Sequence, residues 1–275
     1  MAHAFNSQDI VTFGIPLISK RVAKDFQKVE RLLANTLRSI FHQDHKNVHV
    51  IIACHEIPAI PDEFKGRVTL VESSLDIPRF RWEQEVDRMR KLALIGVEHR
   101  ARGGGWLFII DNDDFVARDV STRIVQSGKK ALVVGNGYRL DALTLKAQKM
   151  SRFWRKCGSS NAINWTVDEL PEAFPLDNPP LFHKFCETRH IYMPELFQSL
   201  GWSYDYLNTP SAVYLINHGQ NQSEIISKMT LKWRIYFMLS KWRDWDGDFA
   251  ETFGVTKSDI VDATYTGTKK FVTEV

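Results

Sequence analysis

Three carboxylates crowd the end of an apolar run in the stretch WLFIIDNDDF, residues 106–115. Asp111, Asp113 and Asp114 follow directly on Trp106–Ile110, with Asn112 between them. Carboxylates this close raise one another's pKa unless a cation lies among them. The stretch therefore predicts either a solvated acidic turn or a site for a divalent ion, and an oxygen-rich ligand set favours Mg²⁺ or Mn²⁺.

Several motifs that combine acids or glycines with a ligand do not fit this stretch. An EF-hand loop needs an oxygen ligand at its fifth position and glycine at its sixth, where Phe115 and Val116 stand. The glycines at 103–105 precede the apolar run, whereas a dinucleotide-binding fingerprint follows its strand. No P-loop motif occurs in the sequence. A D-x-D motif that closes an apolar strand remains.

Composition limits the classes of function. The 275 residues carry 36 basic and 33 acidic side chains, a net charge of +3, so no strong field favours nucleic acid as a partner. The three cysteines form no C-x-x-C pair, which indicates a reducing compartment and no structural zinc. The sequence shows neither a signal peptide nor a membrane-spanning run, so we expect a cytoplasmic protein, with the inner face of the membrane as an alternative.

The surrounding elements are expected to place the acids at the edge of a sheet. Apolar strands are predicted over 9–19, 47–54, 66–74, 106–111 and 130–140. Helices are predicted over 25–43, about 80–100 and 226–245. Apolar strands separated by helices indicate a mainly parallel sheet covered on both faces. Ligands bind beyond the carboxyl ends of such strands, where the acid cluster falls.

This arrangement resembles the GT-A fold of nucleotide-sugar glycosyltransferases, close to bacterial family-two-like members, in which a D-x-D motif ends an apolar strand. Their order of elements is matched by FGIPLISKR, LLANTLRSIFHQ, VHVIIAC, DRMRKLALIGVEH and VYLINHGQNQS. The resemblance covers roughly residues 8–222. It implies a Rossmann-like α/β domain over 1–222, with a nucleotide-binding half at about 8–120 and an acceptor half at about 121–222. A C-terminal helical extension and tail would follow over 223–275.

The resemblance also implies a metal site. Asp111 and Asn112 are expected at the nucleotide, with Asp111 on the ribose, while Asp113 and His218 bind the ion. Asp114 is expected to support them from behind. A histidine in this position is otherwise a structural hydrogen-bonding residue, so that alternative stays open for His218.

Further residues are expected to bind the donor nucleotide, and they fall into three groups. The uracil and ribose would be covered by Ile15, Ser19 and Arg21. The uracil edge would be read by Glu56, or by Asp62. The phosphates would be reached by Arg88 or Lys91, on a helix that could instead present a solvated Asp87–Lys91 pair.

The acceptor side and the catalytic base are expected after residue 150. The segment CGSSNAINW, residues 157–165, resembles the stretch that lies along the donor sugar in these enzymes. Trp154 and Trp165 either stack on sugars or pack in the core. An inverting enzyme needs a carboxylate to accept the acceptor's proton, and the candidates are Asp177 and Asp168.

The resulting hypothesis is a metal-dependent hexosyltransferase that uses Mn²⁺ or Mg²⁺ and a UDP-sugar donor, with a hydroxyl of a glycan or lipid-linked acceptor. The alternatives are a sugar-phosphate nucleotidyltransferase and a non-catalytic carbohydrate-binding protein on a transferase fold. The basic and aromatic residues of 226–245 suggest contact with a membrane surface or a homodimer partner.

Overall fold

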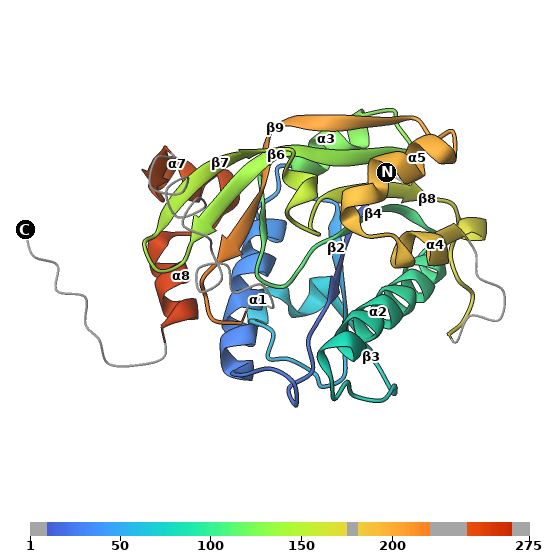
Figure 1. The fold of residues 1–275 in the computed structure, drawn as a ribbon, viewed down its shortest axis with the longest axis horizontal. Helices are drawn as coiled ribbons and strands as arrows, with labels where there is room; N and C mark the ends of the chain where they lie inside the picture. The colour runs from blue at the N-terminus through green and yellow to red at the C-terminus, as the bar shows by residue number, and fades with distance from the viewer. Residues whose placement is uncertain (1–9, 175–180, 221–240, 266–275) are drawn as a thin grey trace, which may run out of the picture.

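The computed structural model describes residues 10–174, 181–220 and 241–265 as an α/β structure with a mixed sheet and helices on both faces (Figure 1). Ten strands of the described chain join this sheet. Its main path runs β10 (Trp242–Asp244), β7 (Lys146–Ser151), β6 (Ala131–Asp141), β8 (Asn161–Trp165), β4 (Gly105–Ile109), β1 (Val11–Pro16), β2 (Val48–Cys54) and β3 (Val68–Glu72). The predicted α/β class with helices flanking the sheet is confirmed. The predicted boundary at residue 222 lies outside the described residues.

The first half of the chain forms the parallel part of the sheet. Its strands are β1 (Val11–Pro16), β2 (Val48–Cys54), β3 (Val68–Glu72) and β4 (Gly105–Ile109), and every pairing among them is parallel. They are connected through α1 (Phe26–Phe41), the short η2 (Asp62–Arg67) and α2 (Arg81–Ala101). The five strands and two helices predicted before residue 141 all lie within a few residues of observed elements.

The second half departs from the predicted mainly parallel sheet. It contains β5 (Phe115–Val116), β6 (Ala131–Asp141), β7 (Lys146–Ser151), β8 (Asn161–Trp165) and β9 (Tyr204–Ile216). Of their pairings only β6 with β9 is parallel, whereas β4–β8, β5–β9, β6–β7 and β6–β8 are antiparallel. The turn between β6 and β7 is too short for a crossover, so these strands form a hairpin. Shorter helices complete this half: α3 (Val120–Gln126), η3 (Phe153–Arg155), η4 (Val167–Glu169), α4 (Leu181–Glu187), η5 (His190–Tyr192) and α5 (Met193–Ser199).

Successive side chains of each strand point to opposite faces of the sheet, and this alternation divides the core into two layers. Val50 and Ile52 of β2 pack on the side of α1, whereas Ile51 and Ala53 pack on the side of α2. Successive side chains of a strand point to opposite faces, so a strand covered on both faces needs apolar residues throughout. This requirement explains the unbroken apolar runs in the sequence.

A glycine turn sets the point where β4 begins. A Cβ on Gly104 would lie 2.6 Å from the carbonyl oxygen of Trp165, and its φ of +73° favours glycine. Nε2 of His99, at the end of α2, lies 3.1 Å from the carbonyl oxygen of Gly105. The carbonyl can only accept, so Nε2 carries the proton. The start of β4, and hence the position of the acids at its end, is held by backbone packing that larger residues would prevent.

The described residues after 240 pack on the same hydrophobic core as the sheet. Trp242–Asp244 forms β10, which pairs with β7, so the helix predicted over 226–245 is wrong at its end, while its residues 226–240 lie outside the described residues. Trp245 is fully buried and stacks on Phe249 of α7 (Gly247–Phe253) at a ring distance of 4.6 Å. Helix α8 (Lys257–Thr264) packs beside α1, where Asn35 donates to a backbone carbonyl at 2.9 Å (Figure 1).

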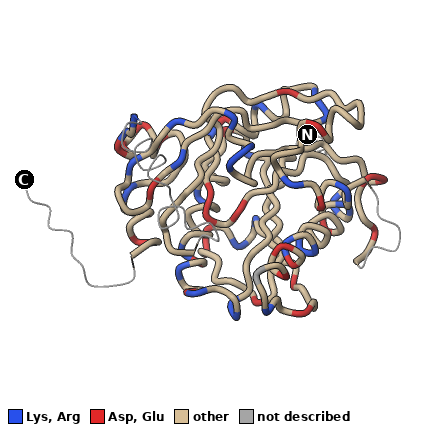
Figure 2. Tube along the Cα trace, in the orientation of Figure 1, with Lys and Arg blue, Asp and Glu red and all other residues tan. Residues whose placement is uncertain are grey.

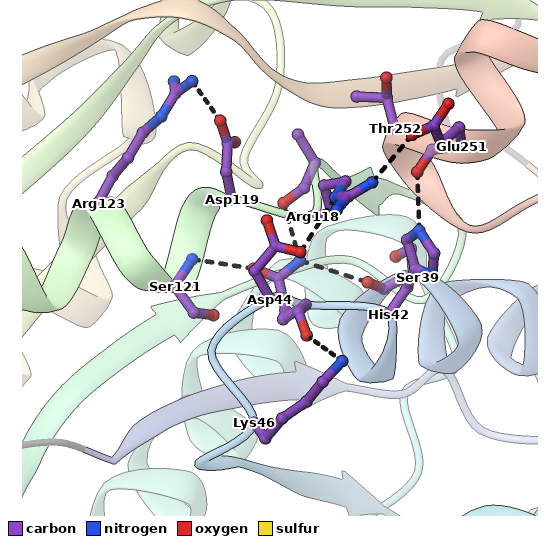
Figure 3. A network of polar contacts seen from close by, with 12 residues as sticks. Ser39, His42, Asp44, Lys46, Arg118, Asp119, Ser121, Arg123, Glu251 and Thr252 are labelled. Atoms are coloured by element: carbon purple, nitrogen blue, oxygen red, sulfur yellow. Dashed lines mark hydrogen bonds and ion pairs between the residues drawn. The ribbon is translucent and has the colours of Figure 1, made fainter.

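Arg118 ties this segment to the loop between α1 and β2 (Figure 3). Its guanidinium contacts Asp44 at 3.0 Å and Glu251 at 3.1 Å, and its backbone N–H donates to the carbonyl of Thr252 at 2.8 Å. Nε2 of His42 lies 2.7 Å from the carbonyl oxygen of Glu251. The network is exposed, so its ion pairs stabilise little, but its backbone bonds fix where α7 lies.

The molecular surface has mixed charge. Basic and acidic residues are interspersed along the described trace (Figure 2). Among the described helices, none combines the length and the apolar character that crossing a bilayer requires.

Trp245→Ala is predicted to lower the free energy of unfolding by about 3–5 kcal/mol, because it leaves a cavity between α7 and the sheet. Chemical denaturation followed by circular dichroism would measure the loss. Trp82→Ala is the matched control, since Trp82 is 67% exposed. Equal, small effects of the two substitutions would contradict the assignment of Trp245 to the core.

Candidate functional site

The acid cluster lies where the sequence placed it, at the carboxyl end of β4. Ile110 continues the strand by donating to the carbonyl of Gly14 at 3.0 Å, and the N–H of Asp114 returns to the carbonyl of Asp111 at 3.2 Å to close a turn. This turn sends the three carboxylates in different directions. The side chain of Asp111 is 37% exposed and that of Asp113 is 19% exposed, whereas Asp114 is buried.

Asp114 joins three segments beneath the turn. Its Oδ2 accepts hydrogen bonds from the hydroxyl of Ser159 at 2.5 Å and the thiol of Cys157 at 3.0 Å, while its Oδ1 accepts from the N–H of Leu215 at 3.3 Å. The Ser159 hydroxyl also accepts from the N–H of Asp111 at 2.8 Å. One carboxyl group therefore connects the D-x-D turn, the loop before β8 and the end of β9.

Burial governs the protonation of this network. Burial above all, and then the charges of Asp113 and Asp111, raise the pKa of Asp114 well above its ordinary value. Burial and the neighbouring Asp114 likewise raise the pKa of the Cys157 thiol, so Cys157 is a hydrogen-bond donor and not a reactive thiolate.

Asp111 faces a cation. Nη2 of Arg88, on α2, lies 3.2 Å from its Oδ1. Gly158 packs against this pair, since a Cβ there would lie 3.4 Å from both Nη2 of Arg88 and Oδ2 of Asp111. The lack of a side chain at Gly158 keeps this edge of the pair open. Within the described residues Asp111 is the one hydrogen-bond acceptor of Arg88, whose guanidinium carries further N–H groups that could face an anion.

Asp113 meets the imidazole of His218. Oδ2 of Asp113 lies 2.9 Å from Nε2, and the His218 side chain is fully buried. Neither ring nitrogen makes a hydrogen bond within the described structure, despite this short distance. Asn217 before it has a φ of 62°, unusual for a residue other than glycine, and Gly219 after it has a φ of 82°. Such strain concentrates at functional sites.

A shared metal ion would account for the contact between Asp113 and His218. Two atoms that bind one octahedral ion at about 2.1 Å stand about 3 Å apart and point at the ion rather than at each other. Within the described residues no group of three or more metal-binding side chains is present. The residues nevertheless fit Mg²⁺ or Mn²⁺ bound together with a phosphate substrate, because such ions take one or two protein ligands and complete their shell with phosphate and water.

The residues predicted to bind the nucleotide base are brought together in part. Oε1 of Glu56 accepts from the hydroxyl of Ser19 at 3.0 Å, and Oε2 accepts from the N–H of Lys20 at 2.9 Å. The N–H of Arg21 donates to the same hydroxyl at 3.2 Å, which orders the loop after β1. The side chain of Ile15 is fully buried in the core, so no part of it is available to a ligand.

Two other predicted nucleotide contacts have structural partners. Lys91 is buried, and its Nζ donates to Oδ2 of Asp87 and to the carbonyl of Leu17, both at 2.7 Å. His55 approaches the other oxygen of Asp87 at 2.8 Å. Lys91 thus holds the loop after β1 in place. Burial lowers the pKa of Lys91 and Asp87 opposes that effect. Asp62 is a surface residue paired with Lys65.

The structure does not bring Asp168 to the site, which corrects its prediction as a catalytic base. Strand β8 runs antiparallel to β4, with Gly105 opposite Trp165 and Ile109 opposite Asn161. The acid cluster follows Ile109, whereas Asp168 follows Trp165, so the two lie at opposite edges of the sheet. Asp168 is exposed in η4. The second candidate, Asp177, lies outside the described residues.

The remaining predicted residues also have defined places. Asn112 lies partly exposed in the D-x-D turn. Trp154 and Trp165 are 8% and 2% exposed, so both pack in the core rather than offering a face to a sugar. Sequence reasoning missed the role of Ser159, although the Gly-Ser-Ser run was noticed, because its bonds to Asp111 and Asp114 depend on the antiparallel placement of β8.

Comparisons with known proteins find only remote structural similarity. No family model matches the sequence, and no curated protein matches it either. Among solved structures, the chain is similar to S. aureus TarS at 11% identity and a TM-score of 0.40, over 75% of this chain and 36% of that one. The chain thus spans about a third of the length of this first structure.

Two other solved structures are similar. A putative nucleotide-diphospho-sugar transferase from Desulfovibrio desulfuricans G20 is 10% identical with a TM-score of 0.38, over 76% of this chain and 81% of that one. Core-mannan synthase A (CmsA/Ktr4) from Aspergillus fumigatus, described as a Mn/GDP form, is 14% identical with a TM-score of 0.25, over 53% and 46% of the two chains. At these TM-scores the similarity adds nothing to the argument from the site.

Ser159→Ala is predicted to destabilise the protein by about 1–3 kcal/mol, because the N–H of Asp111 and the carboxyl of Asp114 both lose a buried partner. Denaturation curves would measure the change. Ser151→Ala, at an exposed position of β7, is the control. A Ser159 variant as stable as the control would show that the hydroxyl does not hold the turn.

Asp114→Asn is predicted to change how stability depends on pH. A carboxyl whose pKa is raised on folding binds more protons in the folded state, so stability falls as pH rises above the unfolded value of about 3.9. The asparagine variant lacks this loss. In metal-free buffer, its stability relative to the unchanged protein should therefore increase between about pH 4 and about pH 7. Parallel pH profiles from thermal denaturation would contradict this expectation.

Proposed function

We propose that this chain is a metal-dependent glycosyltransferase that moves a hexose from a nucleoside diphosphate sugar, with UDP as the nucleotide, to a hydroxyl of a glycan or lipid-linked acceptor. The observation that carries the proposal is the contact between Asp113 and His218 at the end of β4. A carboxylate oxygen and a buried imidazole nitrogen lie 2.9 Å apart there without a hydrogen bond.

Electrostatics explains why such a site suits this reaction. The leaving nucleoside diphosphate gains negative charge as the bond to the sugar breaks, and fixed positive groups that face this charge lower the barrier. Asp113 and His218 would hold Mn²⁺ or Mg²⁺, and the bound ion would neutralise charge on the diphosphate. Arg88 adds a guanidinium at the same edge, positioned by Asp111.

The donor's orientation would come from the loops after β1 and β2. Glu56, ordered by Ser19, offers a carboxylate to an N–H of the nucleobase, and Asp111 offers one to the ribose hydroxyls. Lys91 supports the β1 loop from below and does not reach the phosphates. The proton of the acceptor hydroxyl would pass to Asp177, the remaining carboxylate of the two predicted bases.

Asp113→Ala is predicted to weaken binding of UDP in the presence of Mn²⁺ by more than about tenfold. Even the loss of a residue that only hydrogen-bonds to a metal ligand lowers metal affinity by about tenfold or more. Calorimetric titration of UDP and GDP, each with and without Mn²⁺, would measure the effect. It would also show which nucleobase, uracil or guanine, the protein prefers. Asp168→Ala is the matched control, because this exposed carboxylate lies at the other edge of the sheet. Equal Mn²⁺-dependent binding by both variants would reject the proposal.

Activity assays separate the remaining classes of function. Hydrolysis of a UDP-sugar, or its transfer to an acceptor, supports the glycosyltransferase. Release of pyrophosphate from a nucleoside triphosphate would instead identify a nucleotidyltransferase. UDP binding without turnover across a panel of donors and acceptors would identify a non-catalytic protein. An Asp177→Asn variant that keeps the activity of the unchanged protein would exclude Asp177 as the base.

A further inference from the structure

One face of α1 carries two cations, and the first of them lies beside the turn that carries His218. Lys28 and Arg31 are three residues apart on the helix and so share a face. Nζ of Lys28 lies 3.7 Å from the position that a Cβ on Gly219 would occupy. The ammonium group therefore reaches the residue next to His218, and the end of β9 passes beside α1 (Figure 1).

Several nitrogen atoms of this region are buried without a partner. Nε and Nη2 of Arg31, Nδ2 of Asn217 and Nδ1 of His218 make no hydrogen bond in the part of the chain that the structure describes. Buried guanidinium groups in proteins are normally paired, because an unpaired buried charge loses its hydration without compensation. Unpartnered nitrogen atoms on α1 and on the His218 turn, with Lys28 between α1 and that turn, indicate a missing acceptor.

The nearby carboxylates accept hydrogen bonds from backbone N–H groups. Asp25 caps α1 by accepting from the N–H of Lys28 at 3.0 Å, and Glu30 accepts from the N–H of Ala59 at 2.8 Å. The cations also repel each other: burial first, and then the charge of Arg31, lower the pKa of Lys28 although Asp25 opposes them. A multiply charged anion would remove both costs.

We propose that Lys28, Arg31 and the Asn217–Gly219 turn form an anion site that takes the diphosphate group of the donor and holds it as the leaving group. The inference rests on the proposed function and assigns the contacts of that group. A guanidinium fork and an ammonium group suit phosphate oxygens, which accept several short charge-assisted hydrogen bonds. The site adjoins the Asp113–His218 pair, so both would act on one diphosphate.

The test uses inorganic pyrophosphate as the probe, with the full chain in EDTA so that no metal contributes. The double variant Lys28→Met/Arg31→Met is expected to bind pyrophosphate about tenfold or more weakly than the unchanged protein. It should bind uridine unchanged, because the base and ribose lie elsewhere. The matched control is Lys65→Met/Arg38→Met, since Lys65 pairs with Asp62 and Arg38 with Asp259.

A stability measurement excludes a merely structural role. Methionine removes a guanidinium with two buried, unpaired nitrogen atoms, so Arg31→Met should be as stable as the unchanged protein, or more stable, without ligand. Loss of pyrophosphate binding together with loss of stability would count against the site. So would a failure of the unchanged protein to bind pyrophosphate. Pyrophosphate binding by the double variant as tight as that of the unchanged protein would also count against it.

The outcomes distinguish this inference from the proposed function. Asp113→Ala should keep metal-free pyrophosphate binding, because Asp113 is not one of the cations. If the double variant loses pyrophosphate binding but the unchanged protein neither hydrolyses nor transfers from any nucleotide-sugar, the anion site stands and the transferase fails. If transfer occurs and the double variant binds pyrophosphate and UDP normally, the transferase stands and this site fails.

Discussion

A single buried carboxyl group, that of Asp114, holds together the three segments from which the site is made. It accepts hydrogen bonds from the loop before β8 and from the end of β9, while its own backbone closes the D-x-D turn. Burial disfavours the charged form of this carboxyl and so raises its pKa, and the hydrogen bonds from Cys157 and Ser159 offset part of that cost. Residues distant in sequence are thereby placed within hydrogen-bonding distance of one another.

The sheet, which is covered by a hydrophobic layer on each face, holds these segments in place. The parallel half places the carboxyl ends of β1, β2 and β4 at one edge, where the loops carrying Ser19, Glu56 and Asp111 meet. The antiparallel strand β8 returns beside β4 and carries Ser159 to the same edge at its start. That antiparallel direction also carries the far end of β8, and Asp168 after it, away from the site.

Charge around the site is arranged in pairs with one exception. Asp111 has Arg88, Asp87 has Lys91 and His55, and Asp113 has the imidazole of His218. Nε and Nη2 of Arg31 have no hydrogen-bond partner among the described residues, and Lys28, three residues earlier on α1, stands beside the His218 turn. A site that is balanced except for two cations is suited to a ligand that brings negative charge of its own.

Features that depend on neighbouring residues could be predicted from the amino-acid sequence: the strands and helices of the first half, and the acids at the end of β4. Hydrophobic periodicity and strand ends are local properties, so they can be read along the chain. Contacts between residues distant in the chain could not be predicted in this way. The bonds of Asp114 to Ser159 and Leu215, the burial of Trp245 and the removal of Asp168 from the site follow from strand order and direction, which no local pattern specifies.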